Sequence, residues 1–296
     1  MIARITLKRL VKQTAGWASV LMSPFHERQA HTACILVYHR LAVEPFRDST
    51  LDSWNVPPSI FERQIAGLAS TAEFVGLDEL PARLTQPSGP RPLVCLTFDD
   101  GYANFFTRAL PVLARYHARA TVFVVTGCIG LEQPMPFDRW GNRHARRAGD
   151  EAWRPMNWHE IEACVASGLV TVGAHSQRHL NAVETRAEDL AAEAGQSRAL
   201  LLERLGEDHA FAYSYPYGST RLGQVTPAYV DAVRRAGYRM AVSTDLGLAG
   251  RSSDPFVLPR VEAHATDSPA VLHAKVCGSL VALRVTDQLR TARRTG

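Results

Sequence analysis

The chain has 296 residues, of which 46% are hydrophobic and 21% are charged. These proportions are ordinary for a globular protein and exclude global disorder. The formal net charge is only +4, which is too small to indicate a nucleic-acid partner. At about 150 residues per domain the length allows two domains, but α/β barrels of about 200–250 residues fold as a single unit.

The first 30 residues are predicted to form a basic amphipathic extension. Its cations gather on one face of a predicted helix: Arg4, Lys8, Arg9 and Lys12. This pattern is typical of helices that lie on anionic membranes, and a surface helix packed on the domain is the alternative. The segment makes a poor signal peptide because Lys12 and Gln13 interrupt its apolar stretch. The sequence contains no run of about 18 apolar residues, so no membrane-spanning helix is predicted.

The five cysteines contain no CxxC pair, and their number is odd. Buried free thiols in a reducing compartment are therefore favoured over a disulfide framework. We expect a cytoplasmic protein or one at the inner face of the membrane, with export as the alternative.

Buried strands are predicted where short apolar runs lie between turn signals, at 34–38, 74–75, 93–98, 120–125, 169–172, 211–215, 238–243 and 256–261. Helices are predicted between them, after Val56, at 77–84, through 110–113, at 157–167, 184–205 and 226–236, and in the tail from 268. This alternation favours parallel strands joined by crossover helices. The long segment 126–155 is rich in Pro, Gly, Arg and Trp, and such a loop is usually functional.

Polar residues follow the predicted strands at the points where these end: His39, Asp99, Asp100, His175, His179 and Tyr217. In parallel α/β folds the site forms at the carboxyl ends of the strands, so these side chains should converge. One helical turn would bring His175 and His179 to the same face, where two imidazoles can bracket a metal ion. A carboxylate from another strand end would complete three protein ligands and leave a position for water, which is typical of catalytic sites.

Two adjacent aspartates indicate divided roles, because one can bind metal while the other serves as a general base. Alone, an HxxxH spacing is usually coincidence and a DDG sequence is usually a turn. Their occurrence together at consecutive strand ends indicates a site.

Three motifs carry a family resemblance: Thr97-Phe98-Asp99-Asp100-Gly101, His175-Ser176-x-x-His179 and Tyr215-Pro216-Tyr217-Gly218. In this order they resemble the motifs of the polysaccharide deacetylases, the NodB-homology carbohydrate esterases. The likeness extends from Ile35 to Val261. Its opening segments, Tyr38-His39-Arg40 and Phe61-Glu62-x-Gln64, look most like the branch that contains the biofilm poly-N-acetylglucosamine deacetylases.

The resemblance implies a distorted (β/α) barrel of the NodB-homology type, as a single domain with helical extensions at both ends. We place the deacetylase domain at 31–267, the N-terminal extension at 1–30 and a helical tail at 268–296. The implied activity is the metal-dependent removal of N-acetyl groups from an N-acetylated polysaccharide or a lipid-linked glycan precursor. A deacylase for another amide and a catalytically silent sugar-binding barrel are the alternatives.

The resemblance also implies roles for single residues. Asp100, His175 and His179 would bind a divalent metal, zinc first, with cobalt, nickel or manganese as alternatives, and Asp99 would be the general base. The backbone N–H of Tyr217, after Pro216, would help to hold the oxyanion. Trp140 in the long loop is a candidate substrate contact, as is Asp138.

The leaving amine requires a general acid. His39 matches the position of the acid in the biofilm branch, and His264 and His273 are the alternatives. The third motif departs from the family pattern, because Ser214 stands where an arginine often orients the base. Arg260, near the end of the last predicted strand, is our candidate for the missing guanidinium.

Overall fold

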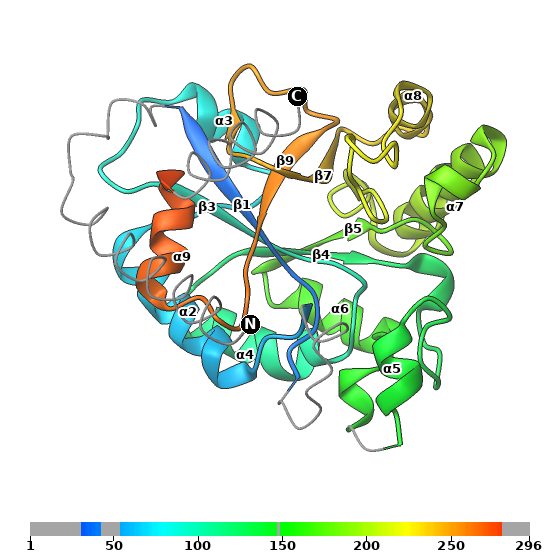
Figure 1. Cartoon of the computed structure of the whole chain (residues 1–296), viewed down its shortest axis with the longest axis horizontal. Helices are drawn as coiled ribbons and strands as arrows, with labels where there is room; N and C mark the ends of the chain where they lie inside the picture. Colours follow the sequence, from blue (N-terminus) through cyan, green and yellow to red (C-terminus); the bar gives the residue numbers. More distant parts are fainter. Residues whose placement is uncertain (1–30, 43–53, 147–148, 280–296) are drawn as a thin grey trace, which may run out of the picture.

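The computed structural model of the chain describes residues 31–42, 54–146 and 149–279 (Figure 1). The predicted extension 1–30 and the end of the predicted tail lie outside the described residues. The strands are β1 (Thr32–Tyr38), β2 (Glu73–Phe74), β3 (Leu93–Phe98), β4 (Ala120–Val124), β5 (Val170–Ala174), β6 (Ala212–Ser214), β7 (Met240–Leu246), β8 (Ala249–Gly250) and β9 (Leu258–Glu262).

The α-helices are α2 (Pro58–Thr71), α3 (Leu80–Thr85), α4 (Leu110–Arg115), α5 (Arg139–His144), α6 (Trp158–Ala166), α7 (Ala187–Leu205), α8 (Pro227–Arg235) and α9 (Pro269–Val276). Short turns of 3₁₀ or π geometry are η3 (Phe105–Ala109), η4 (Thr126–Cys128), η5 (Asp150–Ala152) and η6 (Ala182–Glu184). No described helix is long and apolar enough to cross a membrane.

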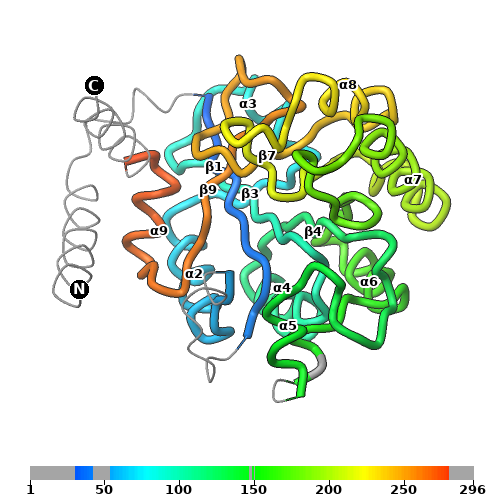
Figure 2. Tube along the Cα trace, turned by 45° about the vertical axis from the view of Figure 1, so that its right-hand side comes forward, coloured from blue at the N-terminus to red at the C-terminus, as the bar shows by residue number. Residues whose placement is uncertain are grey.

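Parallel strands close into a barrel. Their order is β3-β4-β5-β6-β7-β9-β1, and β1 pairs with β3 to complete the ring. Outside the ring, β2 pairs in parallel with β3, and β8 pairs antiparallel with the start of β1. The predicted distorted (β/α) barrel is confirmed. Figures 1 and 2 show the helices around the outside of these strands.

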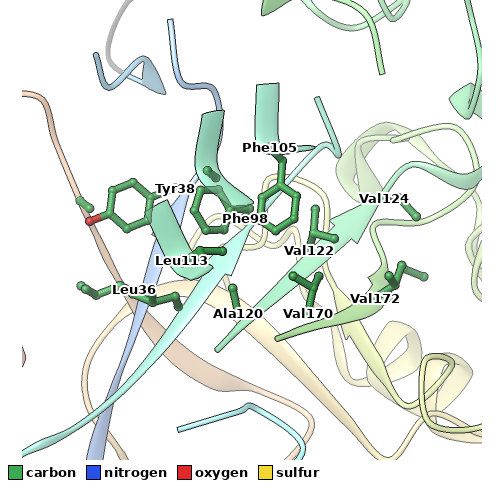
Figure 3. Close-up of a cluster of buried hydrophobic side chains, with 14 of the residues drawn as sticks. Leu36, Tyr38, Phe98, Phe105, Leu113, Ala120, Val122, Val124, Val170 and Val172 are labelled. Carbon is green, nitrogen blue, oxygen red and sulfur yellow. The ribbon is translucent and has the colours of Figure 1, made fainter. Parts of the chain in front are cut away.

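The strands alternate between two apolar layers, as the period of two in a strand requires. On β1, Leu36 and Tyr38 belong to the layer under the helices, where Tyr38 and Phe61 of α2 meet edge to face with 5.2 Å between ring centroids. Figure 3 shows this layer continuing through Phe98 and Val122 on the next strands. Ile35 lies in the second layer, inside the barrel. Both faces of the barrel are therefore filled by apolar side chains along most of the strands.

The start of the predicted tail packs on the barrel. Ser268 caps α9 by accepting a hydrogen bond from the Val271 N–H. The helix lies against α2 at Gly67, where an added Cβ would come within 2.6 Å of Pro269 Cβ. Any larger side chain at Gly67 would therefore separate the two helices.

Several predicted boundaries are wrong by a few residues. The helix predicted from 184 begins at Ala187, because residues 182–184 form a 3₁₀ turn. The helix predicted from 77 begins at Leu80. No helix separates β7 from β9; the short strand β8, which was not predicted, lies between them. All five cysteines lie in the described part and are free, as predicted.

Candidate active site

A cavity of about 230 Å³ opens at the carboxyl ends of the barrel strands. The side chains that line it include His39, Asp99, Asp100, His175, His179 and Tyr217. They follow β1, β3, β5 and β6, so the convergence predicted from the strand pattern is present.

Asp99 and Asp100 lie in a tight turn after β3. The Asp99 N–H still donates to Tyr38 O, 2.9 Å away, which extends the β1–β3 ladder by one residue. Asp100 and Gly101 then both adopt φ of 72°. A Cβ on Gly101 would come within 2.8 Å of Val124 Cγ1, so glycine is required there. The turn separates the two carboxylates and directs them to different partners.

Left-handed backbone is concentrated at this cavity. Among the described residues, the non-glycine positions with positive φ are His31, Asp100, His117, Ser176, His179 and Tyr217. Four of these six line the cavity or belong to the loop that forms it. Such conformations are costly and persist where the surrounding structure enforces them, which is common at functional sites.

His175 and His179 lie in a loop, and the predicted helical turn is wrong. Ser176 and His179 each have φ of 60°, which no right-handed helix contains. Instead, the His179 N–H donates to Ser176 Oγ, 2.9 Å away, and Glu193 of α7 accepts from the N–H groups of residues 177 and 178. The buried Glu193 carboxylate thus shapes the loop, and the two imidazoles meet with 4.8 Å between ring centroids.

Asp100, His175 and His179 form the one cluster of potential metal ligands found among the described residues, with ligand atoms all within 4.8 Å of one another. Asp100 Oδ1 lies 3.5 Å from His175 Nε2 and 3.6 Å from His179 Nε2. His175 Nδ1 lies 2.8 Å from the Ser214 carbonyl and donates to it, which leaves the Nε2 lone pair directed at the cluster. Two nitrogens and one carboxylate oxygen therefore face a common point.

This donor set fits a divalent metal. Burial lowers the pKa of both histidines, so the imidazoles are neutral, as metal ligands must be. Burial and the adjacent Asp99 raise the pKa of Asp100 to about 8. A cation between the three side chains would offset both effects and hold Asp100 ionised. Zinc accepts such a set of two histidines and one carboxylate with a position left for water.

Asp99 faces a fixed guanidinium. Arg260 of β9 donates from Nη1 to Asp99 Oδ1 at 2.8 Å and from Nη2 to Asp99 Oδ2 at 2.7 Å. Ser214 Oγ donates to Asp99 Oδ2 at 3.2 Å and accepts from Arg260 Nη2 at 3.1 Å. Although burial raises the pKa of Asp99, Arg260 and His175 outweigh it and hold this pKa well below its usual range. The base candidate is therefore ionised and held at both oxygens.

His39 is the acid candidate that reaches the cavity. Its Nε2 lies 4.0 Å from Asp99 Oδ2. Burial lowers its pKa to about 4 in spite of Asp99, so its imidazole is neutral at pH 7. His264 instead lies beside Glu262, with 3.2 Å between Nε2 and Oε2. His273 of α9 lines a separate cavity with Thr32 and Leu93, which begin β1 and β3.

The sequence did not single out Arg40, which holds the long loop against the barrel. Its side chain is buried and forms an ion pair with Asp138, which also caps α5 through the Gly141 N–H. The guanidinium lies between the rings of Tyr102 and Trp140, at 4.1 and 4.3 Å from their centroids. Trp140 is only 4% exposed, so Arg40 and the loop cover most of the ring.

Tyr217 and Trp54 are the exposed aromatic residues of the cavity wall. Tyr217 follows the buried Pro216 with φ of 61°, and its ring lies 5.0 Å from that of His179. Trp54, which sequence analysis missed, lies 4.5 Å from the His39 ring. It precedes a proline pair at the start of α2, far from any motif, and only the tertiary fold brings it to the cavity.

Comparisons with known proteins agree with this arrangement. A family model described as polysaccharide deacetylase matches residues 86–241. YxkH of Bacillus subtilis, whose name assigns it to the polysaccharide deacetylases, is 27% identical over 229 residues, covering 77% of this chain and 70% of that protein. The poly-β-1,6-N-acetyl-D-glucosamine N-deacetylase of Staphylococcus aureus MRSA252 is 22% identical over 251 residues, covering 78% of each chain.

Solved structures show the same fold. The deacetylase PplD of Streptococcus pyogenes, in complex with acetate, superposes with a TM-score of 0.67 at 20% identity, covering 83% of this chain and 98% of that one. IcaB of Ammonifex degensii superposes with a TM-score of 0.65 at 23% identity, covering 82% and 96%.

Proposed function

Because this chain belongs to the polysaccharide deacetylase family, we propose that it hydrolyses N-acetyl groups on an N-acetylated polysaccharide or a lipid-linked glycan precursor, with a divalent metal. The observation that carries the proposal is the convergence of Asp100, His175 and His179 in the cavity that also holds the ionised Asp99. A retained base and a complete ligand set disfavour a catalytically silent barrel.

Asp100 and the two imidazoles would hold the metal, with zinc as the first choice and cobalt, nickel or manganese as alternatives. When bound, such an ion polarises the acetyl carbonyl and makes water more acidic. The proton transfers and the stabilisation of the developing charge depend on the residues around the metal ligands.

Asp99 takes a proton from the attacking water, and Arg260 with Ser214 holds its carboxylate in place for that step. Water oxygen bonds to the acetyl carbon, the C–N bond breaks, and acetic acid and a free amine result; the acid then ionises to acetate. The amine must receive a proton as it leaves. His39 is neutral, and its Nε2 lies 4.0 Å from Asp99 Oδ2, which is too far for direct transfer. One bridging water would therefore carry the proton from Asp99 to His39, which then passes it to the amine nitrogen.

The backbone N–H of Tyr217, in the turn after Pro216, is our candidate donor to the oxygen that gains negative charge. Its left-handed conformation fixes the direction of the peptide groups in this turn. Trp140 and Asp138 line the cavity but are buried, so they are weaker candidates for substrate contact.

The location of the protein rests on sequence alone. We place it in the cytoplasm or at the inner face of the membrane, with residues 1–30 as a peripheral anchor on anionic lipid. Flotation with anionic vesicles, with and without residues 1–25, tests the anchor. Equal flotation of both forms would remove it.

Acetate release tests the activity. Wild-type protein is incubated with N-acetylglucosamine oligomers of β-1,4 and β-1,6 linkage, with a small aryl acetate and with a non-sugar acetamide, after chelation and after metal add-back. The linkage panel is chosen because a relative is named for poly-β-1,6-N-acetyl-D-glucosamine. Asp99→Asn is the inactive control. Release from the non-sugar amide alone would favour the alternative deacylase, and no release from any substrate despite bound metal would favour a silent barrel.

A further inference from the structure

The cavity presents several aromatic rings, but most are covered. Tyr102, Trp140 and Tyr215 are at most 4% exposed, and the Phe137 ring stacks on His179 with 3.8 Å between centroids. Trp54 is 41% exposed and Tyr217 is 46% exposed. Only these two rings offer a broad free face to a ligand in the described cavity wall.

The two rings mark different sides of the reacting group. Tyr217 lies beside His179, a candidate metal ligand, so its side of the cavity would receive the acetyl oxygen. Trp54 lies beside His39, the candidate acid, so its side would receive the leaving nitrogen. In an N-acetylated sugar the pyranose ring is bonded to that nitrogen. The ring must therefore lie on the Trp54 side.

Trp54 is held as a platform by its backbone. Its carbonyl accepts from the Arg40 N–H at 3.4 Å, and the Val56 N–H donates to Arg40 O at 3.0 Å. Asn55 Oδ1 accepts from Arg40 Nη1 at 3.1 Å. These bonds tie the backbone of residues 54–56 to the chain directly after β1, and the indole itself packs on the His39 ring with 4.5 Å between centroids. Little of this wall therefore has to be ordered when a ligand binds.

We propose that Trp54 is the stacking surface for the sugar whose acetamido group reacts, and so a determinant of specificity for glycans over other acetylated compounds. This rests on the proposed function, because the direction of the sugar follows from the roles of His39 and the metal ligands. The apolar C–H face of a pyranose would cover the exposed indole, and the ring would gain both apolar burial and directional stacking.

The test compares Trp54→Ala, Trp54→Phe and the control Leu222→Ala with wild type. Leu222 is 69% exposed and does not line the cavity. Acetate release is measured on an N-acetylglucosamine pentasaccharide and on a small acetamide that lacks a sugar, whose leaving amine also needs the proton from the acid. We expect Trp54→Ala to lower kcat/KM about tenfold on the glycan, mainly through KM because stacking is present before and during reaction, and to lower it much less on the acetamide. Trp54→Phe should retain most of the glycan activity.

Equal losses on both substrates would mean that Trp54 acts by positioning His39, and unchanged glycan kinetics would mean that the sugar lies elsewhere; each overturns the proposal. Calorimetric titration of the pentasaccharide into metal-loaded wild type and Trp54→Ala separates this proposal from the proposed function. Binding that weakens about tenfold in Trp54→Ala supports the platform even if no acetate is released. Binding that does not weaken, or no binding to wild type, overturns it.

Discussion

Replacing Arg260 with methionine should destabilise the barrel strongly. The side chains of Arg260 and Asp99 are 0% and 2% exposed, and they share two hydrogen bonds of 2.8 and 2.7 Å. Removing one partner of such a buried pair leaves an uncompensated charge and costs about 3–5 kcal/mol. With about 2–4 °C per kcal/mol for a domain of this size, Tm should fall by about 6–20 °C.

The cause can be separated from simple loss of packing by a double-mutant cycle followed by thermal melts. Asp99→Asn combined with Arg260→Met removes both charges, so it should melt above Arg260→Met alone. Ser214→Ala is the milder control, because it leaves the ion pair in place and removes only one hydroxyl bond to each partner, of 3.2 Å to Asp99 and 3.1 Å from Arg260. If Arg260→Met melts like wild type, or if the two single effects simply add, the unpaired charge is not what destabilises the variant.

Arg260→Met should also change activity in a defined direction. Without the guanidinium, burial moves the pKa of Asp99 upward, so the base holds its proton to higher pH. The acid limb of the kcat/KM profile should therefore shift to higher pH, and kcat should fall about a hundredfold because the carboxylate is no longer oriented. An unshifted acid limb in a folded variant would contradict the proposed role of Asp99.

Three further changes test other parts of the structure. Chelation should abolish acetate release and zinc should restore it in wild type but not in His175→Ala; activity that survives exhaustive chelation would contradict a metal role for this cluster. Arg40→Met should leave Asp138 buried without its partner, cost about 3–5 kcal/mol in a denaturant melt and speed proteolysis within 126–155, whereas unchanged cleavage would mean that Arg40 does not hold the loop. Burial raises the pKa of Glu160, but its bonds to Arg154 and to the Asn157 N–H outweigh burial and bring this pKa below the ordinary 4.5. The ionised Glu160 therefore stabilises the fold above pH 4.5, and this stabilisation is lost as pH falls through the folded pKa. The Tm difference between wild type and Glu160→Gln should then be full at pH 7 and shrink in melts at lower pH; a constant difference would exclude the charge as its cause.

The barrel could be predicted from sequence because its strands are short apolar runs that are buried on both faces. Runs such as 93–98 and 120–125 have few other ways to bury so much apolar surface. Helix starts were less certain, because local hydrogen bonds decide them. Residues 182–184, for example, form a 3₁₀ turn in which Asn181 accepts from the Val183 N–H, and α7 begins only after it.

The predictable part of the site consists of the residues that follow the ends of the strands. The loop of His175 and His179 depends on Glu193, a residue of the next helix, and an i, i+4 spacing alone gives no sign of that partner. Arg40 is held at the cavity by its contacts with the long loop, and Trp54 by its backbone hydrogen bond to Arg40. Arg260 could be proposed because it belongs to the last strand of the barrel, where alternation places it inward with Leu258.

The division between Asp99 and Asp100 follows from the same alternation. Cys95, Thr97 and Asp99 point successively into the barrel, and Arg260 donates to the last two of these from the inner face of β9. Asp100, one residue later, would point outward in a continuing strand. Its left-handed φ instead ends the strand and brings its carboxylate to the two imidazoles. Two identical neighbouring residues thus receive opposite environments, one beside a permanent cation and one beside neutral nitrogen ligands. We therefore expect their roles not to be exchangeable, although their side chains are the same.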